Sequence, residues 1–446
     1  MKKISIYGLF GYLNHQIPIH PGGITFIHGP NGCGKTTVLR LISAIFSWDT
    51  STLFETNFSK IEILEENETK FVVEKESKTP EDSKRPIPVL TFSIQKKEGE
   101  LFKKTESFVL SLDSSGVRFP VGEIEEFFSF LVRVGPREWI DTKTGNRLEY
   151  QDVLEKYGDR LPHFSRKKRP EWLVEYIGKI NLHFIKTQRL LKVDLATLRR
   201  SRPDEKSITD VIQIYSNEIK EIISRKLAEQ AAVSQLHDRS FPERLLGIST
   251  SEYVSEEKIR ELYAETEEKI QGLVDAGLID QQKNIALPSK SFEATEKKVL
   301  SLYLQDVNQK LSVFDDLQNK IQIFLEIVAK KLRTKKFSVN RNDGFSIESL
   351  HRPGEPLHPT QLSSGEQHQI VLFYELIFKA DQNSFFLVDE PEISLHIDWQ
   401  RSFLNDINKI SKLGDRSFLI ATHSPQIIGG YRELAVALEE GILGDE

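Results

Sequence analysis

The order of apolar and polar positions along the chain predicts an α/β protein with short buried strands near both ends. The apolar, β-branched run at 24–27 predicts a strand, and the residues at 37–42 open an amphipathic helix. Near the other end, the apolar runs at 385–388 and 418–421 predict two more strands, and the stretch at 368–378 predicts a helix. Polar or glycine-containing segments follow each of the three strands, so we expect the chemistry of the protein at these strand ends.

The middle of the chain has two other patterns. Residues 54–112 contain alternating runs separated by polar turns, which predict an antiparallel meander. From about 191 to 335 the spacing becomes helical, with long, charged, proline-free segments at 256–273 and 292–332. The apolar spacing is not a sustained heptad, so we expect a compact helical lobe or a short hairpin. We therefore divide the chain into an N-terminal lobe at 1–190, a helical insertion at 191–335 and a C-terminal lobe at 336–446.

The segment between the first predicted strand and its helix matches G-x-x-x-x-G-K-[ST], a pattern that binds nucleotide phosphates. Its glycines let the backbone turn N–H groups toward an anion at the helix N-terminus. Lys35 is expected to reach the β and γ phosphates, and the Thr36 hydroxyl to bind Mg²⁺. The alternative is a glycine-rich turn that binds nothing, but the strand and helix on either side favour a phosphate loop. The expected nucleotide-binding residues here are Gly29, Asn31, Gly32, Cys33, Gly34, Lys35, Thr36 and Thr37.

Three polar segments in the C-terminal lobe are candidates to complete this site. Asp389 and Glu390 follow a predicted buried strand, so Asp389 is expected to hold the metal or its waters and Glu390 to orient and polarise an attacking water. Small residues at 363–365 precede a predicted helix and offer a second anion-binding N-terminus. His423 lies in the polar tip that follows the strand at 418–421, where a sensor of the γ-phosphate is expected.

The segments GPNGCGKTT, LSSGEQ, LVDEPEISLH and ATHSPQ occur in this order in ABC-type ATPases, and the chain resembles the branch that includes the SMC, RecF and OLD-like proteins. The resemblance implies an ABC-type P-loop ATPase head, with a mixed sheet flanked by helices, an antiparallel β subdomain and an inserted helical arm. It also implies ATP and Mg²⁺ as cofactors and two heads that enclose two ATP molecules. Ser363 and Gly365 would then act on the nucleotide of a second subunit, and His423 would be the switch histidine.

Two positions fit this family less directly. Gln188 follows an apolar run and is our candidate for the glutamine that contacts the metal and the attacking water, with a solvent-facing glutamine as the alternative. His396 stands where many members carry an aspartate, which leaves communication between the two sites open.

The composition of the chain bears on the cellular compartment in which we expect the protein to work. The chain has 446 residues, of which 39% are hydrophobic and 28% charged, and no apolar run approaches the roughly 18 residues of a membrane span. The N-terminus lacks the apolar core of a signal peptide. The single cysteine, Cys33, excludes an internal disulfide framework and suits a reducing, cytoplasmic compartment. Inside the phosphate loop it is expected to act as a small side chain, with redox control as the alternative.

Charge gives a clue to a partner. Residues 160–206 hold thirteen Lys and Arg against five Asp and Glu, a local balance of +8, which leaves −14 for the rest of a chain at −6. Such a stretch is able to bind a nucleic-acid backbone. The alternatives are a solvated loop or a surface that docks an acidic subunit.

The chain also lacks recognisable nuclease motifs, and the 23 residues after His423 leave no room for a Toprim domain. We therefore expect any nuclease to be a separate polypeptide of HNH or Toprim type. In this respect the chain resembles ATPase subunits of bacterial anti-phage systems such as Septu and PARIS. A regulatory ATPase of anti-phage defence is the first hypothesis, and a DNA-repair ATPase acting directly on DNA is the second. The helical insertion and the LSSGE segment disfavour a transporter subunit.

Overall fold

The computed structural model describes residues 1–79, 86–99, 101–111, 124–128, 130–135, 138–142, 146–157, 169–185, 191–193, 208–247, 255–281 and 287–438. Contacts divide the chain into two compact units. We call Met1–Thr209 with Ala380–Glu446 the nucleotide unit, and Asp210–Lys379 the helical unit. The expected boundary near 336 differs from this division, because residues 336–379 pack with the helices.

The nucleotide unit contains a parallel sheet that carries the predicted strand ends. Its strand order is β11-β17-β18-β3-β19, and every described pairing in it is parallel. The strands that precede the phosphate loop, the carboxylates and the histidine are therefore neighbours, with β18 between β17 and β3. The strands are β11 (Leu182–Ile185), β17 (Phe385–Asp389), β18 (Ser417–Ala421), β3 (Ile24–His28) and β19 (Ala435–Ala437).

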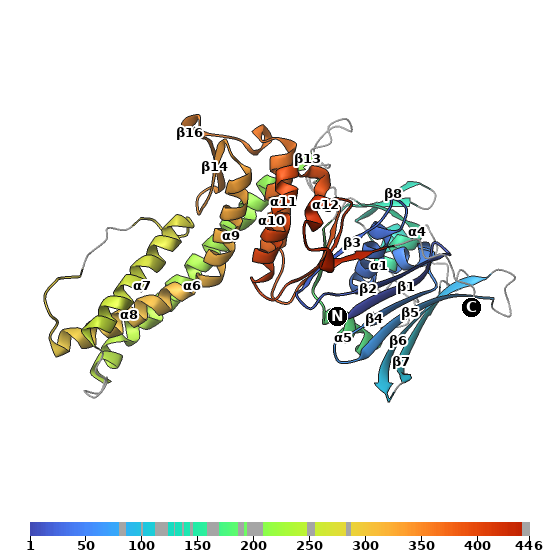
Figure 1. The fold of residues 1–446 in the computed structure, drawn as a ribbon, viewed down its shortest axis with the longest axis horizontal. Coiled ribbons are helices and arrows are strands. Elements are labelled where there is room, and N and C mark those ends of the chain that lie inside the picture. Colours follow the sequence, from blue (N-terminus) through green and yellow to red (C-terminus); the bar gives the residue numbers. More distant parts are fainter. Residues whose placement is uncertain are drawn as a thin grey trace. The chain divides into compact units, whose positions relative to one another are not determined.

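A second sheet of this unit is antiparallel, with the order β2-β1-β4-β5-β6-β7, and includes the meander expected at 54–112. Alternation along β4 buries Ile61 and Ile63 and leaves Glu62 between them less buried. The strands are β2 (Leu13–Pro18), β1 (Lys3–Leu9), β4 (Lys60–Leu64), β5 (Thr69–Lys78), β6 (Ile87–Glu98) and β7 (Leu101–Ser111). They form the broad blue sheet of Figure 1.

Helix α1 (Lys35–Ser47) lies between these two sheets. Its buried side chains, such as Leu39 and Ile42, share one apolar cluster with Ile4 and Phe71 of the antiparallel sheet and with Leu387 of β17. Burying a side chain such as Leu39 contributes about 2 kcal/mol. This packing orients the helix so that its N-terminus meets the end of β3.

The other elements of this unit are shorter. Strands β8 (Leu131–Gly135), β9 (Glu138–Asp141) and β10 (Arg147–Glu149) form a small antiparallel sheet with its own apolar cluster around Trp139. Strand β12 (Leu191–Val193) pairs with β13 (Ile208–Asp210). The remaining helices are α2 (Thr50–Glu55), α3 (Ile124–Phe127), α4 (Tyr150–Tyr157), α5 (Glu171–Gly178), η4 (Pro391–Ser394), α11 (Ile397–Ser411), α12 (Pro425–Ile428) and η5 (Arg432–Leu434).

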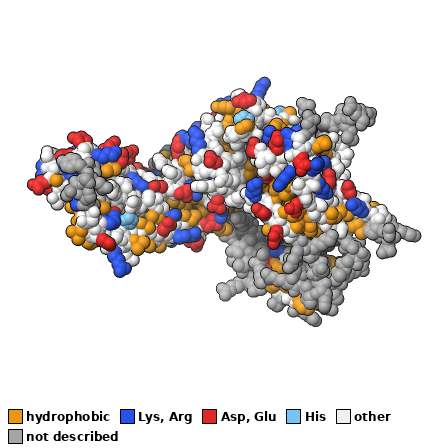
Figure 2. Space-filling model, turned by 90° about the horizontal axis from the view of Figure 1, so that it is seen from below, with side chains coloured by type: hydrophobic (Ala, Val, Ile, Leu, Met, Phe, Trp, Pro, Cys, Tyr) orange, Lys and Arg blue, Asp and Glu red, His pale blue; other side chains and the backbone are white. Residues whose placement is uncertain are grey.

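The helical unit contains long helices that pack side by side (Figure 1). Its described surface mixes acidic and basic side chains, as Figure 2 shows, so these helices present no single-sign patch in that view. The helices are α6 (Val211–Gly247), α7 (Glu256–Asp275), α8 (Ala294–Ser312), α9 (Asp315–Lys331) and α10 (Ser364–Phe378). Between α9 and α10 the chain forms the strands β14 (Lys335–Asn340), β15 (Gly344–Ser349) and β16 (Arg352–Pro356) and the turn η3 (Pro359–Gln361).

The segment at 292–332, where helical spacing is expected, contains two helices, α8 and α9. Asp315 and Asp316 occupy the first turn of α9, where their charges stabilise a new helix N-terminus. Phe314, at the junction, is only 1% exposed. Charge and burial together favour a break that helical periodicity alone did not reveal.

Phe324 of α9 packs against both α10 and the hairpin formed by β14 and β15. Its ring lies 5.5 Å from the ring of Phe378 on α10 and 5.7 Å from those of Phe337 and Phe345 on the hairpin. Helix α6 contacts the same hairpin, since the Ser216 hydroxyl accepts from the Phe345 N–H at 2.8 Å. Helices and hairpin therefore form one packed body.

We expect Gly344→Ala to destabilise the protein. Gly344 has φ 75°, and an added Cβ would lie 2.0 Å from the Ser216 carbonyl oxygen, so the substitution should lower the free energy of unfolding by about 2 kcal/mol or more. Urea denaturation followed by circular dichroism measures the effect. Gly247→Ala is the matched control, because an added Cβ there meets nothing within 4 Å. Equal unfolding midpoints for the two variants would contradict the tight contact.

Candidate nucleotide-binding site

The phosphate loop runs from the end of β3 into α1, as its sequence context predicts. Gly34 caps the helix in the left-handed conformation at φ 87°, and an added Cβ would lie 2.7 Å from Leu9 Cδ2, so the position requires glycine. No side chain caps this end, and no acidic residue lies in its first turn. The first N–H groups of α1 therefore remain available to an anion. Asn31, Gly32 and Thr36 are exposed.

Lys35 lies folded against the loop it belongs to. Its Nζ donates to the carbonyl oxygens of Gly29 at 3.0 Å and Pro30 at 3.1 Å, and it lies 3.8 Å from Cys33 Sγ. The side chain is 5% exposed. These two carbonyls hold the ammonium group at the place where phosphate oxygens could replace them.

Thr36 and Asp389 meet although they are 353 positions apart. The Thr36 hydroxyl donates to Asp389 Oδ1 at 3.0 Å. Asp389 ends β17 and is 5% exposed, so the strand holds its carboxylate in a fixed place. A hydroxyl and a carboxylate are oxygen ligands of the kind that Mg²⁺ prefers. The residues at this point therefore fit a magnesium ion.

Glu390 and His423 lie together at the same edge of the sheet. His423 Nε2 is 3.4 Å from Glu390 Oε1, and each side chain is about one third exposed, at 34% and 27%. Glu390 has a left-handed backbone at φ 45°, and its N–H donates to the Ala421 carbonyl oxygen at 2.8 Å. A carboxylate that is reachable from solvent and paired with an imidazole can accept a proton from water.

Two residues that sequence reasoning did not single out, Glu392 and Gln400, hold the segment around His423. Glu392 Oε1 accepts from the Thr422 hydroxyl at 2.9 Å and from the His423 N–H at 2.5 Å. The Ser424 hydroxyl donates to Gln400 Oε1 at 2.6 Å. The motif letters around Asp389 include Glu392, but nothing in the spacing pairs it with residues thirty positions later.

His15 was also missed, and it lies beneath the phosphate loop. It is 2% exposed on β2, and its Nε2 lies 2.8 Å from the Cys33 carbonyl oxygen, to which a neutral imidazole donates. Burial lowers the pKa of His15 below its ordinary value, and the bond to Cys33 only partly opposes this. The alternation of Leu13, His15 and Ile17 on one strand face was the available signal.

Ser363 and Gly365 belong to the helical unit, and Ser363 is the N-cap of α10. Its hydroxyl accepts from the Glu366 N–H, and its own N–H donates to Glu366 Oε2 at 2.8 Å, which forms a capping box. Ser363 is exposed and Gly365 is half-buried. His396 is the exposed N-cap of α11. Gln188 lies outside the described residues, although the strand before it, β11, pairs with β17.

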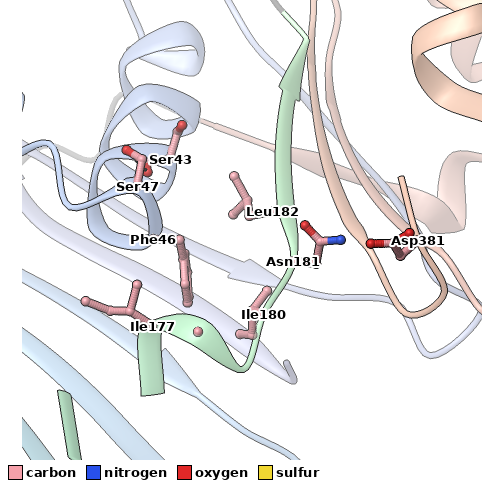
Figure 3. A pocket seen from close by; sticks show the side chains of 9 residues that line it. Ser43, Phe46, Ser47, Ile177, Ile180, Asn181, Leu182 and Asp381 are labelled. Atoms are coloured by element: carbon pink, nitrogen blue, oxygen red, sulfur yellow. Dashed lines mark hydrogen bonds between the residues drawn. The ribbon is translucent and has the colours of Figure 1, made fainter. Parts of the chain in front are cut away.

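A separate cavity of about 460 Å³ lies at the opposite end of α1 (Figure 3). Phe46 and Ser47 from the last turn of the helix line it, together with Ile180, Asn181 and Asp381. Because the phosphate loop precedes the first turn of α1, this cavity is not part of the candidate nucleotide site.

Among the described residues, no three His, Cys, Asp or Glu side chains gather to hold a metal ion. No helix in the described ranges is long and apolar enough to cross a membrane.

A parallel sheet with a phosphate loop after β3 and a carboxylate pair at the end of β17 is typical of P-loop ATPases. The model of the AAA ATPase domain family matches residues 1–428, and the chain belongs to this family. The ATPase head with a helical arm expected from the sequence is therefore the observed fold.

Individual relatives are more distant. UvrABC system protein A of Oceanobacillus iheyensis is 38% identical over 77 residues, which cover 17% of this chain and 8% of that protein. The chain thus spans less than a tenth of that relative's length. Among solved structures, the Smc head domain of Pyrococcus furiosus bound to the C-terminal domain of ScpA is 13% identical with a TM-score of 0.34, covering 99% of this chain and 94% of that one. The SMC head domain of Thermotoga maritima is 12% identical with a TM-score of 0.30, covering 97% and 91%.

We expect the protein to lose stability as His15 becomes protonated. The ordinary histidine pKa is 6.5, and the folded value is lower. Above pH 6.5 both the folded and the unfolded chain carry neutral His15, whereas below it the unfolded chain takes up a proton first, which favours unfolding. Urea midpoints measured between about pH 7.5 and pH 5.5 should fall more steeply for the wild type than for His15→Gln. His20→Gln, at an exposed position, is the control, and equal slopes for all three proteins would refute the role of His15.

Proposed function

We propose that this chain is the ATP-binding and ATP-hydrolysing regulatory subunit of a bacterial anti-phage defence complex in the cytoplasm. In this proposal, pairing of two ATPase heads controls a separate partner nuclease. One observation carries the ATPase part. The hydrogen bond between Thr36 and Asp389 lies at the same sheet edge as the Glu390–His423 pair, so a phosphate cradle, oxygen ligands and a candidate base meet at one place.

The proposed chemistry follows from these positions. The γ-phosphate of ATP would draw Lys35 away from the carbonyls of Gly29 and Pro30. Thr36 and Asp389 would hold Mg²⁺, with Gln188 as a further ligand, and the ion neutralises phosphate charge when bound. Glu390 would accept a proton from the attacking water, and His423 would orient Glu390 and sense the γ-phosphate. Turnover is expected to be slow while the heads are apart.

Pairing of heads supplies the proposed control. Ser363 and Gly365 would contact the nucleotide held by Lys35 of a second copy, so each complete site needs two chains. The exposed Ser363 at the start of α10 supports this, because an exposed helix N-terminus is able to receive a phosphate from outside the chain.

The order of the motifs and the helices α6 to α9 between them support the assignment to anti-phage defence. This arrangement resembles the PtuA family of ATPase subunits from Septu systems, whose partner is an HNH nuclease. A Toprim nuclease is the alternative partner.

A second candidate function is a DNA-repair ATPase that binds DNA directly, which the local charge of +8 at 160–206 favours. Co-purification with the products of neighbouring genes, followed by subunit identification, separates the two. A bound nuclease supports defence, and salt-sensitive DNA binding by an isolated dimer supports repair.

Lys35→Ala should weaken ATP binding by about tenfold or more, because a charge-assisted contact to phosphate is lost. Equilibrium titration with a fluorescent ATP analogue measures this. Arg40→Ala, exposed on the same helix, should bind as the wild type does. Unchanged affinity in Lys35→Ala would remove the phosphate loop from the proposed site.

Glu390→Gln should retain ATP binding and lose turnover by about a hundredfold or more, because an amide can hydrogen-bond water but cannot accept its proton. Release of inorganic phosphate is the readout, and the exposed Glu433→Gln is the control. Turnover at the wild-type rate in Glu390→Gln would show that another group is the base.

Ser363→Arg should leave ATP binding to a single head intact and prevent ATP-dependent pairing, because a long charged side chain would block the start of α10. Sedimentation with and without ATP measures the mass. Gln309→Arg, exposed on α8, should pair normally. Normal pairing and normal hydrolysis by Ser363→Arg would mean that the sites are not completed by a second copy.

A further inference from the structure

The start of α10 places a negative charge where the proposed function needs a phosphate to bind. Glu366 lies in the first turn, is buried, and points its carboxylate back at Ser363. Its Oε2 accepts from the Ser363 N–H at 2.8 Å and from the Ser363 hydroxyl at 2.9 Å. A buried carboxylate at this position repels a phosphate unless a cation neutralises it.

Lys335 supplies that cation. Its Nζ donates to both Glu366 oxygens at 2.7 Å, and the two side chains are 17% and 11% exposed. Lys335 is the first residue of β14, directly after α9, and its N–H is tied to the Leu332 carbonyl oxygen at 3.1 Å. Burial alone would raise the pKa of Glu366, but the bonds from Lys335 and Ser363 outweigh it and lower the pKa.

We propose that Lys335 is a positioning residue for the shared ATP site: by holding and neutralising Glu366, it allows the Ser363 hydroxyl to turn toward the phosphate of a second copy. This inference rests on the proposed pairing of heads. It concerns a residue outside every segment that the motifs single out.

The reason lies in the single proton of the Ser363 hydroxyl. In the structure that proton goes to Glu366 Oε2, so Ser363 must break this bond before it can donate to a phosphate. With Lys335 present, Glu366 keeps the ammonium and the Ser363 N–H as donors after the hydroxyl leaves. Without Lys335, the buried carboxylate would retain the hydroxyl, and its charge would face the incoming nucleotide without compensation.

The test measures ATP-dependent pairing in a Glu390→Gln background, where slow turnover keeps ATP bound. Lys335→Met should weaken pairing by about tenfold or more, while ATP binding to a single head stays close to that of the parent. Because Lys335→Met leaves the Glu366 carboxylate without its cation, the unfolding midpoint should also fall, and pairing is therefore measured at a temperature well below that midpoint. Lys335→Arg should restore pairing because it preserves the charge. Adding Glu366→Gln to Lys335→Met should also restore most of it, since glutamine keeps the capping box and removes the charge. Lys336→Met, at the exposed neighbouring position, is the control for net charge.

The outcomes separate this inference from the function on which it rests. If the parent fails to pair with ATP, the proposed pairing is wrong and the inference falls with it. If the parent pairs and Lys335→Met pairs equally well, only the inference is overturned. The inference is also overturned if Lys335→Met fails to pair and neither Lys335→Arg nor the added Glu366→Gln rescues it, because the defect then does not act through the charge on Glu366.

Discussion

The parallel register of β17, β18 and β3 is the constraint on which the candidate site depends. Asp389 pairs with Ala421 across one strand boundary, and Ala421 pairs with Ile27 across the next, so three strand ends lie level at one edge. Each strand is then followed by a functional segment. A shift of one residue in either pairing would separate Thr36 from Asp389, and a shift between β17 and β18 would also separate Glu390 from His423. The long stretch of chain between β3 and β17 does not affect the geometry of the site as long as these strands pair in this register.

Contacts around these strand ends hold the functional segments in place. Helix α1 is held between two sheets by apolar contacts, and this fixes where its free N–H groups point. His15 supports the loop from below through the Cys33 carbonyl. Glu392 ties the turn after β17 to the segment that carries His423. The protein thus restrains the backbone of the site firmly, while the chemical groups of Thr36, Glu390 and His423 remain reachable from solvent.

The helical unit resolves a conflict between local stability and the proposed function. The Glu366 carboxylate in the first turn of α10 interacts favourably with the helix dipole and completes a capping box, and both effects stabilise the helix. The same carboxylate opposes the binding of phosphate. Lys335 removes the conflict because it comes from a different element and reaches both oxygens of Glu366.

The sequence by itself determined the local features of the nucleotide unit: the strands predicted at 24–27, 385–388 and 418–421, the antiparallel meander and the phosphate loop were all predictable. These features depend on neighbouring residues, whose apolar runs and glycines specify conformation directly. Only the tertiary structure decided the partners. The roles of His15, Glu392 and Lys335, the break between α8 and α9 at Phe314, and the packing of residues 336–379 with the helices depend on contacts between distant segments. Periodicity can place a side chain such as His15 on a buried face, but it does not identify the partner, because a buried polar side chain is specified by the group it meets in space.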